Sequence, residues 1–185
     1  MNFHNITYPD MNNGSGLRVV LWLSGCDHRC KGCQNPQTWD VNSGIPFDEK
    51  AEQELFEKLD EDYISGITLT GGDPLNKNNL DDVLKLVNKI HLLLPEKTIW
   101  LYTGYTVNIF ESSFSDHTEI ETIPKSKVKL DLTRAMIISK CDVVVDGRFE
   151  EDKKDLTLRW RGSSNQHVID IKKSLNQKKV VLWCD

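Results

Sequence analysis

Four short apolar runs, each bounded by turn residues or by polar stretches, recur along the chain. They cover residues 19–23, 66–70, 98–103 and 143–145 and are rich in β-branched, leucine and aromatic residues. Short runs of this kind indicate strands that are buried on both faces, as in a parallel sheet.

Polar stretches with apolar residues at helical spacing separate these runs. Asp48 can cap a helix that reaches about residue 59, and a second helix begins near residue 80 and is stopped by Pro95. A third helical pattern covers residues 130–140. Alternating strands and helices with right-handed crossovers predict an α/β fold with a mostly parallel sheet.

The remaining segments break this alternation. Residues 111–129 are polar, and we interpret them as a surface insertion. In the tail, residues 168–171 and 180–183 are apolar around Asn176-Gln177, which is typical of a hairpin. Without a repeat or a linker-like segment, the sequence predicts one domain over residues 1–185.

Composition narrows the class of function. The net charge of −5 argues against a protein that mainly binds nucleic-acid backbones. The apolar runs are far shorter than the roughly 20 residues that cross a bilayer, and residues 1–9 lack the features of a signal peptide. Five cysteines, three of them clustered, fit a reducing compartment and a metal site. We therefore expect a cytoplasmic protein with neither a membrane nor a nucleic acid as partner.

Three cysteines lie within eight residues directly after the first apolar run. Cys26, Cys30 and Cys33 are spaced C-x3-C-x2-C, whereas Cys141 and Cys184 lie far along the chain. Structural zinc sites and electron-transfer clusters commonly use four protein ligands. Three close thiolates can instead hold a cubane iron–sulfur cluster and leave one iron open to bind a substrate.

A zinc site completed by His28 is the alternative for these thiolates. Because His28 lies inside the cysteine loop, it would be cramped in reaching the same ion, and we interpret it as a solvated loop residue. A measurement of iron and sulfide would exclude a zinc-binding module.

The cysteine spacing is that of the radical S-adenosylmethionine enzymes. Further stretches resemble, in the same order, the activating proteins of anaerobic ribonucleoside-triphosphate reductases. These stretches are residues 25–39, Gly71-Gly72-Asp73-Pro74-Leu75, residues 100–105, residues 146–149 and residues 160–166.

The resemblance implies a partial (β/α) barrel with helices outside. It implies a 4Fe-4S cluster held by Cys26, Cys30 and Cys33, with S-adenosylmethionine on the open iron. The reduced cluster would cleave S-adenosylmethionine, and the resulting 5′-deoxyadenosyl radical would take a hydrogen atom from a glycine of the large reductase subunit. The implied partners are that subunit and an electron donor such as flavodoxin or ferredoxin.

The resemblance also implies the contacts to S-adenosylmethionine. The glycine-rich stretch would hold the methionine end, because backbone without a Cβ can approach a ligand closely. Gln34 stands where the family leads us to expect an aromatic residue, and it could hydrogen-bond to the adenine. Gly104, after the third strand, would make room for the cofactor. The expected cofactor contacts are Gly32, Cys33, Gln34, Gly71, Gly72 and Asp73.

Other functions also fit the sequence. The chain could activate another glycyl-radical enzyme, such as pyruvate formate-lyase, act on a small molecule, or be a non-catalytic zinc module. The stretch around Trp160 and Arg161 has residue types enriched at interface hot spots, so it is a candidate for docking the partner protein, with a structural loop as the alternative. A short chain leaves the barrel incomplete, which suits a large protein substrate.

Overall fold

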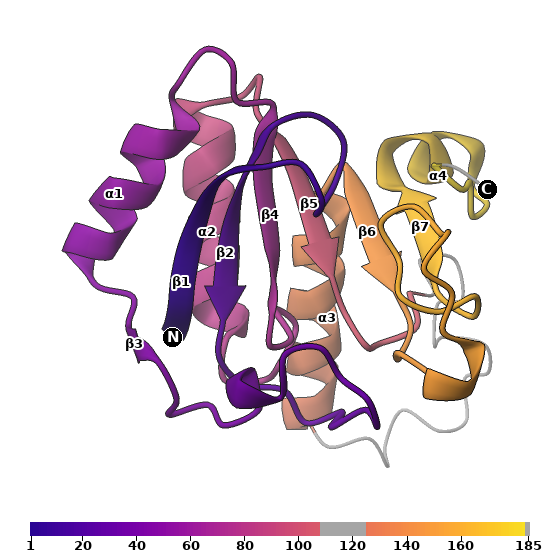
Figure 1. Cartoon of the computed structure of the whole chain (residues 1–185). Helices are drawn as coiled ribbons and strands as arrows, with labels where there is room; N and C mark the ends of the chain where they lie inside the picture. The colour runs from indigo at the N-terminus through magenta and orange to yellow at the C-terminus, as the bar shows by residue number, and fades with distance from the viewer. Residues whose placement is uncertain (108–124, 184–185) are drawn as a thin grey trace.

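The structure is a computed structural model that describes residues 1–107 and 125–183, with only the backbone described for residues 125–131. Within these residues, seven strands form one sheet in the order β3-β1-β2-β4-β5-β6-β7 (Figure 1). The strands are β1 (Asn2–Asp10), β2 (Arg18–Leu23), β3 (Ile45–Pro46), β4 (Gly66–Gly71), β5 (Thr98–Tyr102), β6 (Val143–Asp146) and β7 (His167–Asp170). The helices are α1 (Glu49–Leu59), α2 (Leu80–Leu93), α3 (Lys125–Ser139) and α4 (Ile171–Gln177), with 3-10 turns η1 (Pro36–Thr38) and η2 (Glu151–Lys153).

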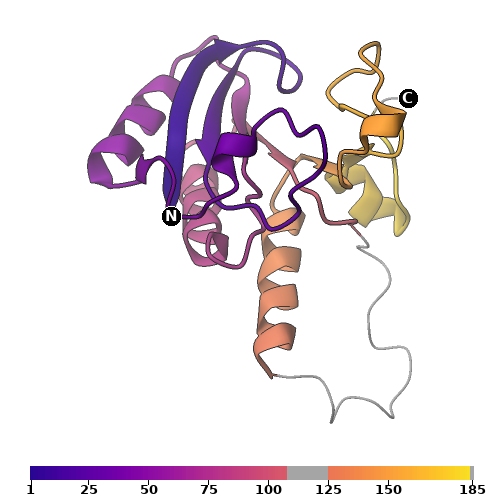
Figure 2. The ribbon, with the colours of Figure 1, turned by 60° about the horizontal axis from the view of Figure 1, so that its bottom comes forward.

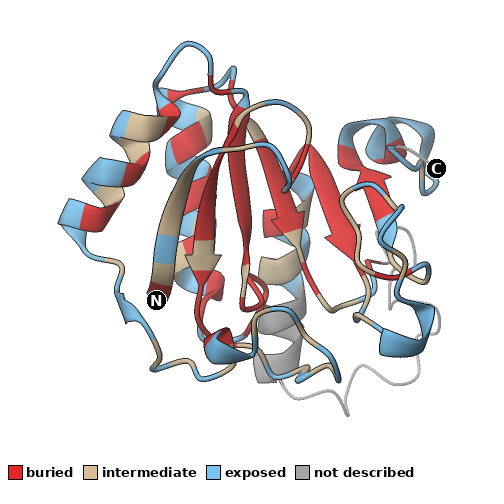
Figure 3. Cartoon of the chain, in the orientation of Figure 1, coloured by how far each residue is buried: buried red, intermediate tan, exposed pale blue. Residues whose placement is uncertain are grey.

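The centre of the sheet is parallel. Strands β2, β4, β5 and β6 pair in parallel in that order, and most of their residues are buried, as the red strands of Figure 3 show. The four predicted strands and the α/β class are therefore confirmed. Because the strands run the same way, their carboxyl ends meet at one edge, where open α/β sheets bind ligands.

Helices cover one face of this sheet. Helices α2 and α3 lie behind the strands in Figure 1, and α1 packs beside α2. Asp48 caps α1 by accepting a hydrogen bond from the backbone of Ala51 at 3.0 Å, and α2 ends before Pro95, both as predicted. On the other face lie the loop after β2 and the segment between β6 and β7 (Figure 2). Loops rather than helices thus close the face on which a ligand would bind.

The sheet is open, so it does not form a closed barrel. Antiparallel strands flank its parallel centre: β1 and β3 on one side and β7 on the other. Strand β1 was not predicted from the sequence, because its residues are mostly polar and only Phe3 is buried. An antiparallel strand with one wet face needs no continuous apolar run, so the pattern of β1 is weak.

The tail differs from the predicted hairpin. Strand β7 forms, but α4 follows it directly, and the Asp170 carboxylate caps α4 by accepting from the backbone of Lys173 at 2.9 Å. Residues 180–183 return to β7 only through the isolated bridge between Ile169 and Leu182. The two predicted segments therefore pair antiparallel at one bridge, but α4 rather than a turn joins them, because Asp170 at the end of the strand starts a helix.

The predicted insertion over residues 111–129 falls largely outside the described residues. Its last part, from residue 125, belongs to α3, so this helix begins earlier than the predicted residue 130. In the described part of the chain, no helix is both long and apolar enough to cross a membrane.

Candidate functional site

A cavity of about 400 Å³ opens at the carboxyl edge of the parallel strands. Seven of the predicted site residues line it: Cys26, Cys30, Cys33, Gln34, Gly71, Gly72 and Asp73. Gly32 is the exception, because it is exposed and a Cβ built on it would lie 2.9 Å from a carboxylate oxygen of Glu151. The fold thus brings the cysteine loop and the glycine-rich loop to one cavity, although they lie about forty residues apart.

Backbone hydrogen bonds fix both ends of the cysteine loop. Gly25 donates to the carbonyl of Thr38 at 2.7 Å, and Cys26 donates to the carbonyl of Trp39 at 3.0 Å. Between these bonds the chain turns through a left-handed residue, Arg29, with φ of 46°. The loop therefore leaves β2, curls and returns beside its own start, and its three cysteines line one cavity.

Burial affects the protonation of Cys26, the first cysteine of the loop. It raises the pKa of the Cys26 thiol to about 11, while the backbone N–H groups of His28 and Arg29 act in the opposite direction. The backbone of Asn35 donates to the sulfur of Cys33 at 3.3 Å. N–H groups directed at sulfur suit thiolates that carry negative charge, as metal-bound cysteines do.

Among the described side chains, no three histidine, cysteine or acidic groups converge on one ion. A cubane cluster spreads its ligands over separate irons, so three cysteines around a cavity fit it better than they fit one zinc ion.

The glycine-rich loop packs directly against the cysteine loop. Gly72 donates to the carbonyl of Leu23 at 2.7 Å, and Asp73 donates to the carbonyl of Gly25 at 2.8 Å. A Cβ on Gly72 would lie 2.7 Å from that same Gly25 oxygen. Gly72 is therefore needed where two backbone segments meet, a reason that the sequence analysis did not foresee.

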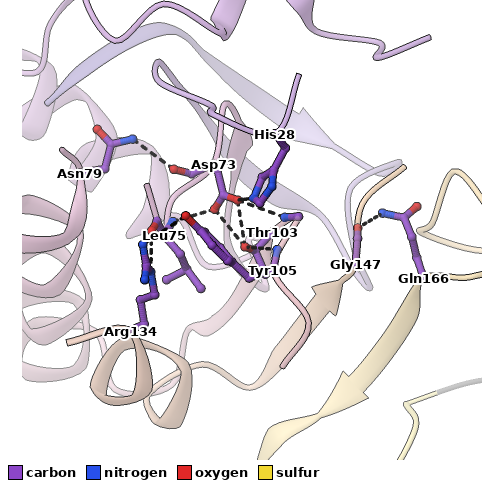
Figure 4. A network of polar contacts seen from close by, with 10 residues as sticks. His28, Asp73, Leu75, Asn79, Thr103, Tyr105, Arg134, Gly147 and Gln166 are labelled. Atoms are coloured by element: carbon purple, nitrogen blue, oxygen red, sulfur yellow. Dashed lines mark hydrogen bonds and ion pairs between the residues drawn. The ribbon is translucent and has the colours of Figure 1, made fainter. Parts of the chain in front are cut away.

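The carboxylate of Asp73 accepts several hydrogen bonds (Figure 4). It accepts from the backbone of Leu75 at 2.8 Å, from the hydroxyl of Thr103 at 3.0 Å and from the backbone of Gly104 at 3.0 Å. The fourth donor is Nε2 of His28, 2.7 Å from Oδ2. Asp73 is 2% exposed, so protein donors satisfy this buried charge.

His28 is not the solvated loop residue that the sequence analysis predicted. Its side chain is 6% exposed, and its ring lies edge-on to Tyr105 with 4.6 Å between ring centroids. A Cβ on Gly104 would lie 2.7 Å from Cγ of His28. The space on the Cβ side of Gly104 therefore holds the imidazole, while Gly104 itself lines the cavity. Nothing in the local sequence signals this contact, because its acceptor lies 45 residues away.

The segment between β6 and β7 forms another wall of the cavity. Trp160 packs edge-on against Trp100 at 5.1 Å, and Arg161 donates to the carbonyl of Gln166 at 3.1 Å. The side-chain amide of Gln166 in turn donates to the carbonyl of Gly147 at 2.9 Å (Figure 4). Several lining residues of this cavity were not predicted from the sequence: Asn12, Asn13, Trp22 and Thr70.

Comparison with known proteins identifies the family. A family model described as a 4Fe-4S single cluster domain matches residues 12–169. The anaerobic ribonucleoside-triphosphate reductase-activating protein of Escherichia coli (strain K12) is 40% identical over 170 residues, which cover 91% of this chain and 97% of the relative. The chain belongs to this family of activating proteins.

Other activating proteins of the family match over the same extent. The protein of that name from Pasteurella multocida (strain Pm70) is 39% identical over 170 residues, 91% of this chain and 96% of the relative. The one from Enterobacteria phage T4 is 38% identical over 168 residues, 91% of this chain and 93% of the relative. The resemblance drawn from the sequence is therefore confirmed, and the cysteine loop falls within the matched 4Fe-4S domain.

Proposed function

We propose that the chain activates an anaerobic ribonucleoside-triphosphate reductase by reductive cleavage of S-adenosylmethionine. The observation that carries the proposal is the shared cavity, which Cys26, Cys30 and Cys33 line together with Gly71 and Gly72. The names of the relatives support the same task, since each is called an activating protein of that reductase.

The three cysteines of the loop are the proposed cluster ligands. Cys141, the fourth described cysteine, is 1% exposed, and its thiol donates to the carbonyl of Ile137 at 3.3 Å, so it cannot serve as a further ligand. With three ligands, one iron stays open to the amino and carboxylate groups of S-adenosylmethionine. Held by these cysteines, a 4Fe-4S cluster would supply the electron for reductive cleavage of S-adenosylmethionine, the chemistry that would lead to a glycyl radical on the reductase.

The protein's own residues would bind and orient S-adenosylmethionine and shield the radical from water. The glycine-rich loop would meet the methionine end through its backbone, since the Asp73 carboxylate is occupied by protein donors. Gln34 is exposed at the rim of the cavity, where its amide could reach the adenine edge. Walls of tryptophan and tyrosine, Trp22, Tyr102 and Trp160, would limit the access of water to the radical.

The proposed partner is the large, glycyl-radical subunit of the reductase, with flavodoxin or ferredoxin as electron donor. We infer that the open sheet is the partial barrel of the radical S-adenosylmethionine type. The cavity opens at the carboxyl edge of the open sheet, which would leave a path for a protein segment to enter. The same feature fits other glycyl-radical enzymes, so pyruvate formate-lyase is the second candidate substrate.

The test is anaerobic reconstitution followed by three measurements. We expect about four irons and four sulfides per chain, formation of 5′-deoxyadenosine with dithionite, and a glycyl radical by electron paramagnetic resonance with the reductase subunit of the same organism. Pyruvate formate-lyase, offered in its place, is expected to give no radical. Zinc without sulfide, or a radical on the lyase alone, would overturn the proposal.

A further inference from the structure

We propose that His28 is a positioning residue that couples the cysteine loop to the glycine-rich loop through Asp73. The two loops carry the proposed cluster ligands and the proposed cofactor contacts. Their relative position would therefore decide whether S-adenosylmethionine reaches the open iron. The part of this inference that concerns cofactor binding rests on the proposed function, whereas the coupling of the loops does not.

The tip of the cysteine loop depends on His28. The base of the loop is tied to the glycine-rich loop by the bond from the backbone of Asp73 to the carbonyl of Gly25. Between Cys26 and Cys30, within the described residues, only His28 makes a side-chain hydrogen bond to a residue outside the loop. Its removal would free the segment that carries Cys30 while leaving the base in place.

The acceptor of this bond is held rigidly. The backbone of Leu75, in the same loop, and the hydroxyl of Thr103, after β5, donate to the Asp73 carboxylate at 2.8 Å and 3.0 Å. A carboxylate with several donors in a buried site forms strong hydrogen bonds, because water does not compete for it. His28 is thus anchored to the sheet, since Thr103 directly follows β5.

The ring of His28 is also clamped on two sides. It lies over Gly104, whose missing Cβ leaves the space, and edge-on to Tyr105 at 4.6 Å. Arg134 of α3 braces this tyrosine: its guanidinium lies 4.4 Å from the centre of the Tyr105 ring and donates to the Tyr105 hydroxyl at 3.1 Å and to the Leu75 carbonyl at 3.0 Å. Figure 4 shows these side chains converging from the cysteine loop, the glycine-rich loop, the end of β5 and α3. The arrangement fixes the direction as well as the length of the bond.

Four variants test the coupling. His28→Ala removes the bond, and His28→Gln keeps an N–H donor near the position of Nε2. Gly104→Ala places a Cβ where the imidazole now lies, so it displaces His28 without changing it. The double variant His28→Ala with Gly104→Ala separates the two effects. His91→Ala is the matched control, because the ring of His91 also makes one hydrogen bond, to the backbone carbonyl of Lys140 at 2.7 Å, but does not line the cavity.

Two measurements are made on the full chain of each variant. One is the affinity for S-adenosylmethionine, followed by the change it causes in the electron paramagnetic resonance spectrum of the reduced cluster. The other is amide hydrogen exchange of residues 26–33 in the protein after iron removal. The second needs neither cluster nor cofactor, so it tests the coupling even if the proposed function fails.

We expect His28→Ala and Gly104→Ala each to weaken S-adenosylmethionine binding about tenfold, the effect of about 1.4 kcal/mol. Exchange of residues 26–33 should be several-fold faster in both, and the double variant should be no worse than either single one. His28→Gln should stay within about twofold of the parent, and His91→Ala should change neither quantity. The inference is overturned by unchanged exchange in His28→Ala, by a glutamine variant as weak as alanine, or by losses that multiply in the double variant.

Discussion

Gly72 lies against the backbone of Gly25, so close that a Cβ on Gly72 would come within 2.7 Å of the Gly25 carbonyl oxygen. Gly25 is the residue from which the cysteine loop departs, and its carbonyl accepts a hydrogen bond from Asp73. The glycine-rich loop therefore supports the cysteine loop, in addition to its proposed contact with S-adenosylmethionine. A substitution at Gly72 should therefore affect both the cysteine loop and the binding of S-adenosylmethionine.

Gly72→Ala should reduce iron retention as well as S-adenosylmethionine binding. The added methyl group meets backbone atoms, which cannot rotate away, and overpacking of this kind costs roughly 1–3 kcal/mol. The measurement is iron per chain after reconstitution, with affinity measured on the loaded fraction. Gly66→Ala is the control: its Cβ would lie 2.6 Å from the backbone nitrogen of Thr98, at the opposite end of β4. It should destabilise the fold yet leave iron per folded chain unchanged. Full iron retention in Gly72→Ala would contradict the supporting role.

Replacing any one of the three loop cysteines by alanine should abolish the cluster and all S-adenosylmethionine cleavage. Cys141→Ala should retain both, because this thiol is buried beneath α3 and bonded to the carbonyl of Ile137. Burial also raises the pKa of Cys141, so this thiol stays protonated at neutral pH. Removing its sulfur should cost about 1 kcal/mol or less of folding stability, seen as a small fall in the melting temperature. Loss of absorbance from the cluster in Cys141→Ala would refute the three-ligand set.

The parts of the fold that could be predicted are those with a strong local pattern. Runs such as residues 19–23 are buried on both faces, so their apolar character shows their place at the centre of the sheet. Strand β1 could not be found in this way, because its residues alternate only weakly between core and water. In the tail, Asp170 was not recognised as a helix cap, although its carboxylate accepts from the backbone of Lys173.

The residues of the candidate site differ in the same way, because only some of them have a recognisable local pattern in the sequence. The cysteines are recognisable because their spacing is itself the chemical signal. The prediction that His28 is a solvated loop residue was wrong. Its side chain is buried by Asp73, Gly104 and Tyr105, which only the folded chain brings to it. Contacts between loops that lie far apart in sequence leave no periodicity, and a single sequence cannot show them.

Arg18 gives a prediction about stability that is separate from the site. Its side chain is fully buried, and its five donor contacts run to Ser15, Ile67, Thr68 and twice to Thr98. Burial lowers the pKa of Arg18 to about 10, so near neutral pH it is charged in both the folded and the unfolded chain. Its contribution to stability should therefore not vary with pH near neutrality.

Arg18→Met should lower the free energy of unfolding by at least about 3 kcal/mol. The lost donors leave buried carbonyl and hydroxyl groups unpaired, and each such group costs roughly 1–3 kcal/mol. Urea unfolding of the full chain measures the change, and Arg148→Met, at an exposed arginine, is the control. A change below about 1 kcal/mol would mean that water replaces the guanidinium.

The last prediction concerns the segment that the sequence analysis proposed for docking the partner. Trp160 packs on Trp100, and the guanidinium of Arg161 bonds the carbonyl of Gln166, so both are engaged within the protein. Leu156 is different, because it lines the mouth of the same cavity and is 83% exposed. An apolar side chain held in water at the entrance is better placed to meet a large protein.

Trp160→Ala should therefore lower stability, by about 1–3 kcal/mol for a half-buried ring, and reduce uncoupled S-adenosylmethionine cleavage together with glycyl-radical formation. Leu156→Ala should leave the melting temperature and uncoupled cleavage with dithionite unchanged, yet lower the radical yield on the reductase several-fold. Cleavage is read as 5′-deoxyadenosine and the radical by electron paramagnetic resonance. If Trp160→Ala spares cleavage and loses only the radical, the docking role originally given to Trp160 stands. If Leu156→Ala gives a full radical yield, the partner does not contact this rim of the cavity.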